Sequence, residues 1–261
     1  MFSFVFFCVA FTILVTTNAL SSPPKGWKTR PVMPELAKSN KNRGEKSNTG
    51  KREPWDPIRF IQQSSKFIPK PSFGRSDSTV VRPGDIIWKP GVSSSLNNNF
   101  RWAPLDDVVM GGVSSSMIDN ETGSWKGTVS ESNNGGFVGI RTTPFSKILN
   151  FEQCAGIRLR LRGGDGRTFK AIVRDSTDFN GICWTTSFDM PRVKSFFSVF
   201  DDSEIKTTTT IKIPFKNQIP TIFAKTVPGE IFNSENIVGL QIAYSKVSVT
   251  KCEKSAKVTP E

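Results

Sequence analysis

The chain has 261 residues, of which 36% are hydrophobic, so it can bury the core of one sizeable domain and still carry further segments. It contains no histidine, which excludes Ser-His-Asp and Cys-His nucleophile systems, histidine-ligated zinc and proximal-histidine haem. No convincing pair of catalytic carboxylates is present either. We therefore predict no enzymatic activity, no catalytic residue, no cofactor, no metal and no small-molecule substrate. Of the formal net charge of +12, residues 1–89 carry +9, with 15 Lys and Arg against 6 Asp and Glu.

The N-terminal residues predict a leader that directs the chain to an organelle. The apolar run Phe2–Val15 is followed by the small residues Thr17-Asn18-Ala19, which is typical of a cleavable signal sequence over residues 1–19. An uncleaved anchor is the alternative. Residues 20–52 are rich in Ser, Pro, Asn, Lys and Arg, so we expect a disordered, transit-like segment.

This two-part leader favours a plastid as the destination. A mitochondrial presequence fits less well, because the apolar run carries no charge. A simple secreted protein is the other alternative, and a glycosylation sequon at Asn120 would suit it.

Residues 53–78 predict a short helix and a linker. Asp56 is suited to cap a helix that begins at Pro57, because a proline ring fits the first helical position. The apolar residues available for one side are Ile58, Phe60, Ile61, Phe67 and Ile68. Such a helix could pack on the following domain, or dock to a membrane or a partner.

Residues 79–250 predict an all-β domain, followed by a polar tail over residues 251–261. Apolar and basic residues alternate in Gly156–Arg162, Gly163-Gly164-Asp165-Gly166 predicts a turn, and the alternation resumes with Phe169 facing inward. We therefore expect an antiparallel hairpin here. Further short strands are predicted at Trp125–Glu131, Phe137–Thr142, Ile182–Asp189, Ile211–Phe215 and Val238–Ile242. Because no long helical pattern interrupts them, we expect an antiparallel sandwich.

The segment Trp102–Met117, WAPLDDVVMGGVSSSM, is the most unusual of the domain. Its double glycine, Gly111-Gly112, indicates a turn or bulge, since each glycine would cost about 1 kcal/mol inside a helix. The acidic pair Asp106-Asp107 suits hydrogen bonding in a tight turn, and Trp102 and Trp125 are expected in the core. Taken alone, the segment could be a strand corner without chemistry.

Four further motifs follow in order. They are GTVSESNNGGFVGIR (Gly127–Arg141), GIRLRLRGGDGRTFKAIVRD (Gly156–Asp175), TTIKIPF (Thr209–Phe215) and IVGLQIAY (Ile237–Tyr244). Over roughly Trp88–Tyr244 the chain resembles the complex I intermediate-associated protein family. The resemblance implies a jelly roll of the galactose-binding type and a non-enzymatic assembly factor. Its implied partners are protein subunits of a membrane electron-transfer complex, either respiratory complex I or a photosynthetic complex.

The chain departs from the family pattern at its C-terminal end. Either Val247–Thr250 is a shortened closing strand, or that strand is missing and leaves a sheet edge open to another chain.

A first candidate partner-binding surface is a basic stripe on the outward side of the expected hairpin. It would carry Arg158, Arg160, Arg162, Lys170 and Arg174. Such a stripe could meet RNA, an acidic protein loop or a lipid headgroup, or could simply be a solvated face. RNA recognition would favour exposed aromatic side chains beside the arginines, and the inward register of Phe169 does not supply one.

A second candidate surface is the glycine-rich loop end, where the family resemblance is densest. Its candidate residues are Asp106, Asp107, Gly111, Gly112, Gly135 and Gly136, next to Asn133 and Asn134. Domains of this fold can hold a sugar or a calcium ion at such an end, but the spacing of a known calcium loop is absent. Two rival functions stay open: a carbohydrate-binding module of the secretory pathway, and an RNA-associated plastid expression factor.

The cysteines beyond the leader are Cys154, Cys183 and Cys252, without CxxC spacing. Buried or unreactive thiols are favoured, and a Cys154–Cys183 disulfide is the alternative. The sequence RGGDGR over residues 162–167 lacks the glycine spacing and following helix of a dinucleotide-binding turn.

Overall fold

The structure of the protein is a computed structural model that describes residues 4–5, 9–15, 54, 56–68, 78–92, 101–162, 166–190, 208–223 and 225–245. Several predictions fall outside these residues: the transit-like segment 20–52, the turn residues 163–165, the closing strand at Val247–Thr250 and the tail.

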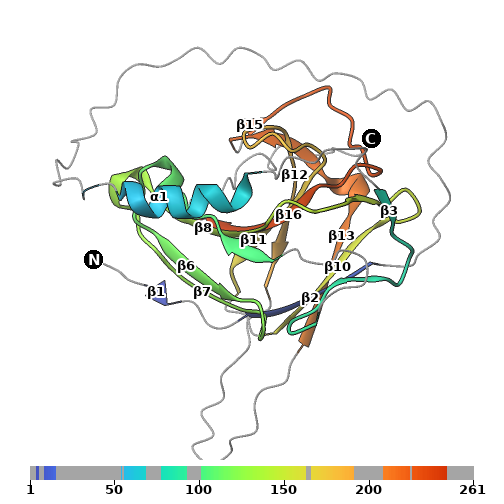
Figure 1. Cartoon of the computed structure of the whole chain (residues 1–261), viewed down its shortest axis with the longest axis horizontal. Coiled ribbons are helices and arrows are strands. Elements are labelled where there is room, and N and C mark those ends of the chain that lie inside the picture. Colours follow the sequence, from blue (N-terminus) through green and yellow to red (C-terminus); the bar gives the residue numbers. More distant parts are fainter. Residues whose placement is uncertain are drawn as a thin grey trace, which may run out of the picture.

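Two seven-stranded antiparallel sheets form a sandwich (Figure 1), which confirms the predicted fold class. The first sheet has the order β1-β7-β2-β10-β13, with β4 beside β2 and β6 beside β7. Its strands are β1 (Phe4–Val5), β2 (Val9–Val15), β4 (Ile86–Trp88), β6 (Ser115–Asp119), β7 (Ser124–Val129), β10 (Gly156–Arg162) and β13 (Thr208–Pro214).

The second sheet has the order β15-β14-β12-β11-β16-β8-β5. Its strands are β5 (Trp102–Pro104), β8 (Phe137–Thr142), β11 (Thr168–Arg174), β12 (Cys183–Asp189), β14 (Ile219–Ile222), β15 (Lys225–Thr226) and β16 (Gly239–Ser245). A separate parallel pair joins β3 (Ser78–Val80) to β9 (Ile148–Asn150). Helix α1 (Pro57–Ser64) follows β2 in the chain, and the short 3-10 turns are η1 (Ser65–Phe67), η2 (Asp107–Met110), η3 (Ser132–Asn134) and η4 (Phe215–Asn217).

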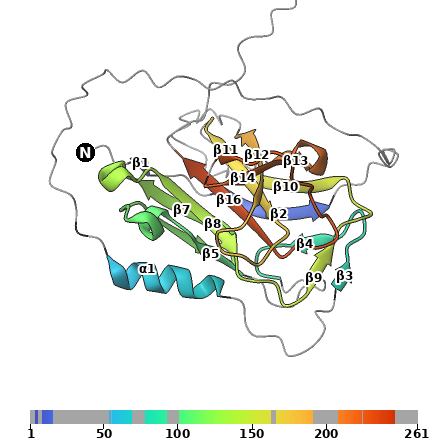
Figure 2. The same cartoon turned by 90° about the horizontal axis from the view of Figure 1, so that it is seen from above.

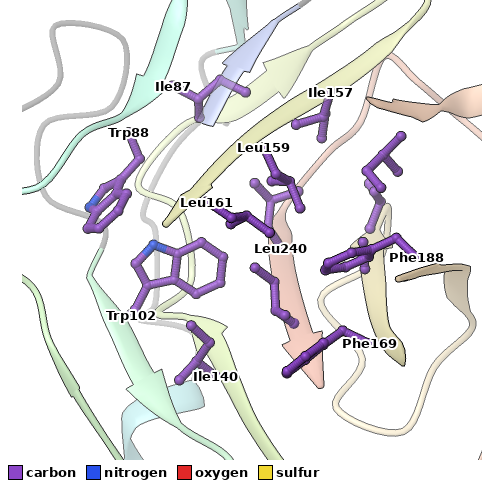
Figure 3. Close-up of a cluster of buried hydrophobic side chains, with 14 of the residues drawn as sticks. Ile87, Trp88, Trp102, Ile140, Ile157, Leu159, Leu161, Phe169, Phe188 and Leu240 are labelled. Carbon is purple, nitrogen blue, oxygen red and sulfur yellow. The ribbon is translucent and has the colours of Figure 1, made fainter. Parts of the chain in front are cut away.

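One hydrophobic core fills the space between the two sheets (Figure 3). The predicted inward residues of β10 and β11 all lie in it: Ile157, Leu159, Leu161, Phe169, Ala171 and Val173. Trp102 and Trp125 are also buried in this core, as expected, and Trp102 packs edge-on against Trp88 at 6.1 Å between ring centroids. Because each such large apolar side chain contributes about 1.5–3 kcal/mol on burial, this core is the main source of stability.

The predicted hairpin of β10 and β11 is wrong. Strand β10 pairs with β13 and β2, whereas β11 pairs with β12 and β16, so the two strands belong to opposite sheets (Figures 1 and 2). Their inward sides face each other across the core instead of lying side by side. Alternation along a strand indicates which side of that strand is buried. It does not indicate whether the next strand in the chain pairs with it or lies in the opposite sheet.

Residues 9–15 of the leader lie in the first sheet as strand β2. Phe11–Val15 pair with Ile157–Leu161 of β10, and other residues of β2 pair with β7 and β4. Cleavage of a signal sequence over residues 1–19 stays a prediction.

Helix α1 begins as predicted, with Asp56 at the N-cap and Pro57 in the first turn. The side chain of Asp56 accepts a hydrogen bond from Arg59 N at 3.0 Å. The helix packs on the domain (Figure 2) through Arg59 and Gln63, and Phe67 of the following η1 is buried as well. The side of α1 that meets the domain is polar, whereas Ile58 and Ile61 are exposed.

Candidate functional site

The acidic pair lies where β5 leads into η2, and both side chains are buried. The Asp106 carboxylate accepts hydrogen bonds from Ser116 Oγ (2.6 Å), Ser116 N (2.8 Å), Gln63 Nε2 (3.0 Å) and Arg59 Nη2 (3.2 Å). Arg59 and Gln63 come from α1, and Ser116 comes from β6. Asp106 therefore fastens the helix and a strand of the first sheet to the end of β5.

Asp107 forms a second network. Its Oδ1 accepts from Ser114 N at 2.9 Å, while Oδ2 accepts from Ser114 Oγ at 2.5 Å and from Gly136 N at 2.7 Å. Ser114 Oγ also accepts from Ser130 N at 2.9 Å. The side chain of Asp107 thus joins η2 to the chain segments that lead into β6 and β8.

The neighbouring glycines make room for the Asp107 carboxylate. A Cβ atom added at Gly112 would lie 2.3 Å from Asp107 Cγ, and one added at Gly135 would lie 2.4 Å from Asp107 Oδ2. Gly111, at φ +90°, and Gly136, at φ +134°, adopt left-handed backbone that favours glycine. Gly112 and Gly135 therefore leave the space that the Asp107 side chain occupies.

This geometry corrects the predicted loop-end surface. Asp106, Asp107, Gly112 and Gly136 are buried, and only Gly111 and Gly135 are partly accessible. Burial raises the pKa of Asp106, against the hydrogen bonds from Ser116 and Gln63 and the charge of Arg59. The carboxylate oxygens of Asp106 and Asp107, which could have bound calcium or a sugar, already accept internal hydrogen bonds. Among the described residues, no group of His, Cys, Asp and Glu side chains could hold a metal ion.

The predicted basic stripe is divided between two faces. Arg158, Arg160 and Arg162 lie on the outer side of β10 in the first sheet, whereas Lys170 and Arg174 lie on the outer side of β11 in the second. Arg160 and Arg162 are exposed, while Arg174 is only 2% exposed. The predicted stripe is wrong for the same reason as the hairpin, because β10 and β11 belong to opposite sheets. The predictions of RNA binding and membrane-surface contact therefore have no single basic surface to support them.

A buried arginine that the sequence analysis missed, Arg141 of β8, lies near Arg174. Arg141 is 6% exposed, and its guanidinium lies over the rings of Phe67 and Phe179, with Cζ at 5.3 and 5.5 Å from the centroids. Burial, followed by the charge of Arg174, lowers the pKa of Arg141 to about 10. The alternation of β8 places Arg141 on the outer side of the sheet, where Phe67 of η1 and Phe179 between β11 and β12 cover it.

Large apolar side chains are exposed on α1, directly after η1 and on η2. Four of them, which we call the apolar patch, are Ile58 (67% exposed), Ile61 (62%), Ile68 (67%) and Met110 (69%). Two of the four, Ile58 and Ile61, lie on α1, and Asp106 binds Arg59 and Gln63 of the same helix. Helix α1 therefore presents isoleucines to solvent on a firmly anchored support.

Three smaller predictions concern a disulfide, a glycosylation site and membrane contact. Cys154 and Cys183 are free thiols, so the alternative of a disulfide between them is wrong. The side chain of Asn120 accepts from Trp102 N at 2.8 Å and donates to Trp102 O at 3.0 Å, so the sequon amide is already engaged. Within the described ranges, no helix is long and apolar enough to cross a membrane.

Comparison with known proteins adds the identity that the geometry does not supply. A search of curated proteins found no match. Residues 92–256, more than half of the chain, match the family model described as complex I intermediate-associated protein 30. This range contains the acidic pair, its glycines and most strands of both sheets. The chain therefore belongs to the complex I intermediate-associated protein 30 family.

Proposed function

We propose that the protein is a non-enzymatic, chaperone-like assembly factor that binds protein subunits of a membrane electron-transfer complex through the apolar patch. The family to which the chain belongs is associated with the assembly of complex I. The observation that supports this mode of binding is the position of Ile58 and Ile61, one helical turn apart and exposed on α1. Subunits awaiting assembly expose apolar surfaces, and an apolar helix face can cover such a surface until the next subunit arrives.

Anchoring of α1 supports the same proposal. The hydrogen bonds from Arg59 and Gln63 to Asp106 hold the helix in place before any partner binds. A preordered helix loses little conformational freedom on binding, so its apolar contacts translate more fully into affinity. The acidic pair would then act as a support for the binding surface without touching the client.

The destination and the client complex belong to the proposal as well. The leader supports an organelle, with a plastid favoured, where the client would be a photosynthetic complex or a relative of complex I. A mitochondrial client would be respiratory complex I itself. The engaged side chain of Asn120 counts against the secretory alternative, because an attached glycan would displace its hydrogen bonds to Trp102.

Affinity purification tests this function. The chain would be tagged at its C-terminus and purified from membranes in mild detergent, and co-purifying proteins would be identified by mass spectrometry. The test variant carries Ile58→Ser and Ile61→Ser. The matched control carries Phe223→Ser and Ile231→Ser, which are 69% and 88% exposed and lie outside the patch.

We expect subunits of one electron-transfer complex with the wild-type chain and the control, and their loss with the patch variant. Their identity would decide between a respiratory and a photosynthetic client. Recovery of no such subunit, or equal recovery with all three chains, would contradict the proposal. N-terminal sequencing of the purified chain would show separately whether it is cut near residue 19 or beyond residue 51.

A further inference from the structure

Arg141 and Arg174 bring two positive charges together beneath the surface of the second sheet. They lie on β8 and β11, the two neighbours of β16. Both approach Phe179: the Cζ atom of Arg141 lies 5.5 Å from its ring centroid, and Arg174 Nη2 donates to its carbonyl oxygen at 3.4 Å. On β16, Gly239 lies opposite Arg174 and Gln241 lies opposite Arg141.

Neither arginine has a carboxylate partner among the described residues, where Arg59–Asp106 is the single ion pair. Arg174 donates to the carbonyl oxygen of Asp178 and, through Nη1, to Cys183 Sγ at 2.8 Å, while its buried Nε has no hydrogen-bond partner. Arg141 lies against two aromatic rings and near Cys183, and its side chain makes no hydrogen bond within the described residues. Two buried cations that repel each other are unfavourable unless an anion balances them.

The nearest internal groups do not supply that balance. The carboxylate of Asp175 accepts from Trp184 Nε1 at 2.7 Å and from Asn233 N at 3.3 Å, so it serves other donors. Burial raises the pKa of the Cys183 thiol, and this effect outweighs the opposing pull of Arg174 and Arg141. Burial therefore disfavours the thiolate form of Cys183, and the described residues place no carboxylate against the two arginines.

We propose that Arg141 and Arg174 form a binding site for a phosphate group, either free phosphate or the monoester of a small molecule. A phosphate carries a charge of about −1.5 to −2 at pH 7, which matches two guanidinium groups, and its oxygens accept from the planar donors of arginine. Phe67 is buried, whereas Phe179 is 42% exposed on the segment that connects β11 to β12. An anion would therefore enter past the Phe179 ring. This site is separate from the apolar patch and goes beyond the proposed function.

Isothermal titration calorimetry and thermal unfolding of the full-length chain in a phosphate-free buffer of constant ionic strength test the proposal. One arm uses inorganic phosphate, and the other uses glycerol 3-phosphate. The variants are Arg141→Met and Arg174→Met, with Arg160→Met as the matched control, because Arg160 is an exposed arginine on the opposite sheet. Circular dichroism checks that each variant is folded.

We expect saturable binding and a rise in Tm with the wild-type chain and Arg160→Met, and at least tenfold weaker binding in either site variant. If Arg174→Met does not fold, Arg141→Met decides alone, because Arg141 has no hydrogen bond to lose. Tighter binding of glycerol 3-phosphate would support an organic phosphate as the ligand, and tighter binding of inorganic phosphate would support the free anion. Absence of binding, or unchanged binding in Arg141→Met, would overturn the proposal. So would rapid alkylation of Cys183 at neutral pH without phosphate binding, since a thiolate would then supply the missing charge.

Discussion

The buried acidic pair and the buried arginine pair are opposite solutions to the placement of charge inside a protein. Every carboxylate oxygen of Asp106 and Asp107 accepts hydrogen bonds from nearby groups. Arg174, in contrast, has an unpartnered Nε, and Arg141 faces aromatic rings. The two pairs are buried to a similar extent but differ in how completely their charged groups are hydrogen-bonded. A charge with its hydrogen bonds complete serves the fold, whereas a charge without them is poised for a group from outside.

Removing Asp107 should have the largest effect on stability. Asp107→Ala leaves the buried donors Ser114 N and Gly136 N without their acceptor, and we expect a loss of about 3–5 kcal/mol in the free energy of unfolding. Urea denaturation followed by circular dichroism measures it. Asp119→Ala, at an exposed carboxylate on β6, is the control and should change little. A loss below about 1 kcal/mol for Asp107→Ala would show that the network contributes little to the fold.

Filling the space beside Asp107 should have the next largest effect. In Gly112→Ala the new methyl group would overlap the carboxylate, so we expect a loss of about 2–3 kcal/mol in the same measurement. Gly111→Ala separates this overlap from backbone strain, because its Cβ meets no atom within 4 Å while its φ is +90°. It should lose only about 1 kcal/mol. Equal losses for the two variants would mean that conformation, and not the carboxylate, requires the double glycine.

Replacing Arg141 should not lower the free energy of unfolding, in contrast to the two changes above. Without phosphate, Arg141→Met removes an unbalanced buried charge and keeps apolar volume under Phe67, so we expect stability to stay equal or rise by about 1 kcal/mol. Urea denaturation in phosphate-free buffer measures it. A loss as large as that of Asp107→Ala would mean that Arg141 is fully compensated inside the fold, and the contrast between the two pairs would disappear.

The smallest expected effect is a difference between the wild-type chain and Asp106→Asn in how stability depends on pH. Because the pKa of Asp106 is raised in the folded chain, this carboxyl binds its proton more tightly when folded than when unfolded. Its contribution to stability is therefore complete below its ordinary pKa of 3.8 and is lost as the pH rises through the folded-state pKa. The stability of the wild-type chain relative to Asp106→Asn should fall from acid toward neutral pH.

Asp119 provides a control of opposite sign for this titration. The hydrogen bond from Thr122, with that from Glu121 N, lowers the pKa of Asp119, so its contribution is present above 3.8 and lost as the pH falls. The stability of the wild-type chain relative to Asp119→Asn should therefore rise with pH. Slopes of the same sign in the two comparisons would contradict the role of burial at Asp106.

The features that could be predicted from the sequence are local ones. Asp56 and Pro57 mark the start of α1 because capping and the proline ring act within one turn. The alternation in Gly156–Arg162 identifies strand β10 and its buried side because side chains of a strand alternate strictly. The family motifs likewise identified the sandwich.

Features that depend on distant partners could not be predicted in the same way. The partner of β10 is set by sheet pairing across more than 50 residues, as in Ile157–Ile213. The polar buried side of α1 depends on Asp106, 43 residues beyond Gln63. For the acidic pair, one signal was present: Ser114 and Ser116, on alternate positions of a short polar run, could supply hydroxyl and backbone donors to adjacent carboxylates. Arg141 gave no such signal, because its cover comes from Phe67 and Phe179, both distant in the sequence.

The position of β16 has a consequence for biogenesis. It is the last strand in the described chain, yet it lies in the interior of the second sheet between β11 and β8. During synthesis, neither neighbour can complete its pairing until residues 239–245 have emerged. The sandwich thus cannot close early, and a chain rich in such non-local pairings folds slowly.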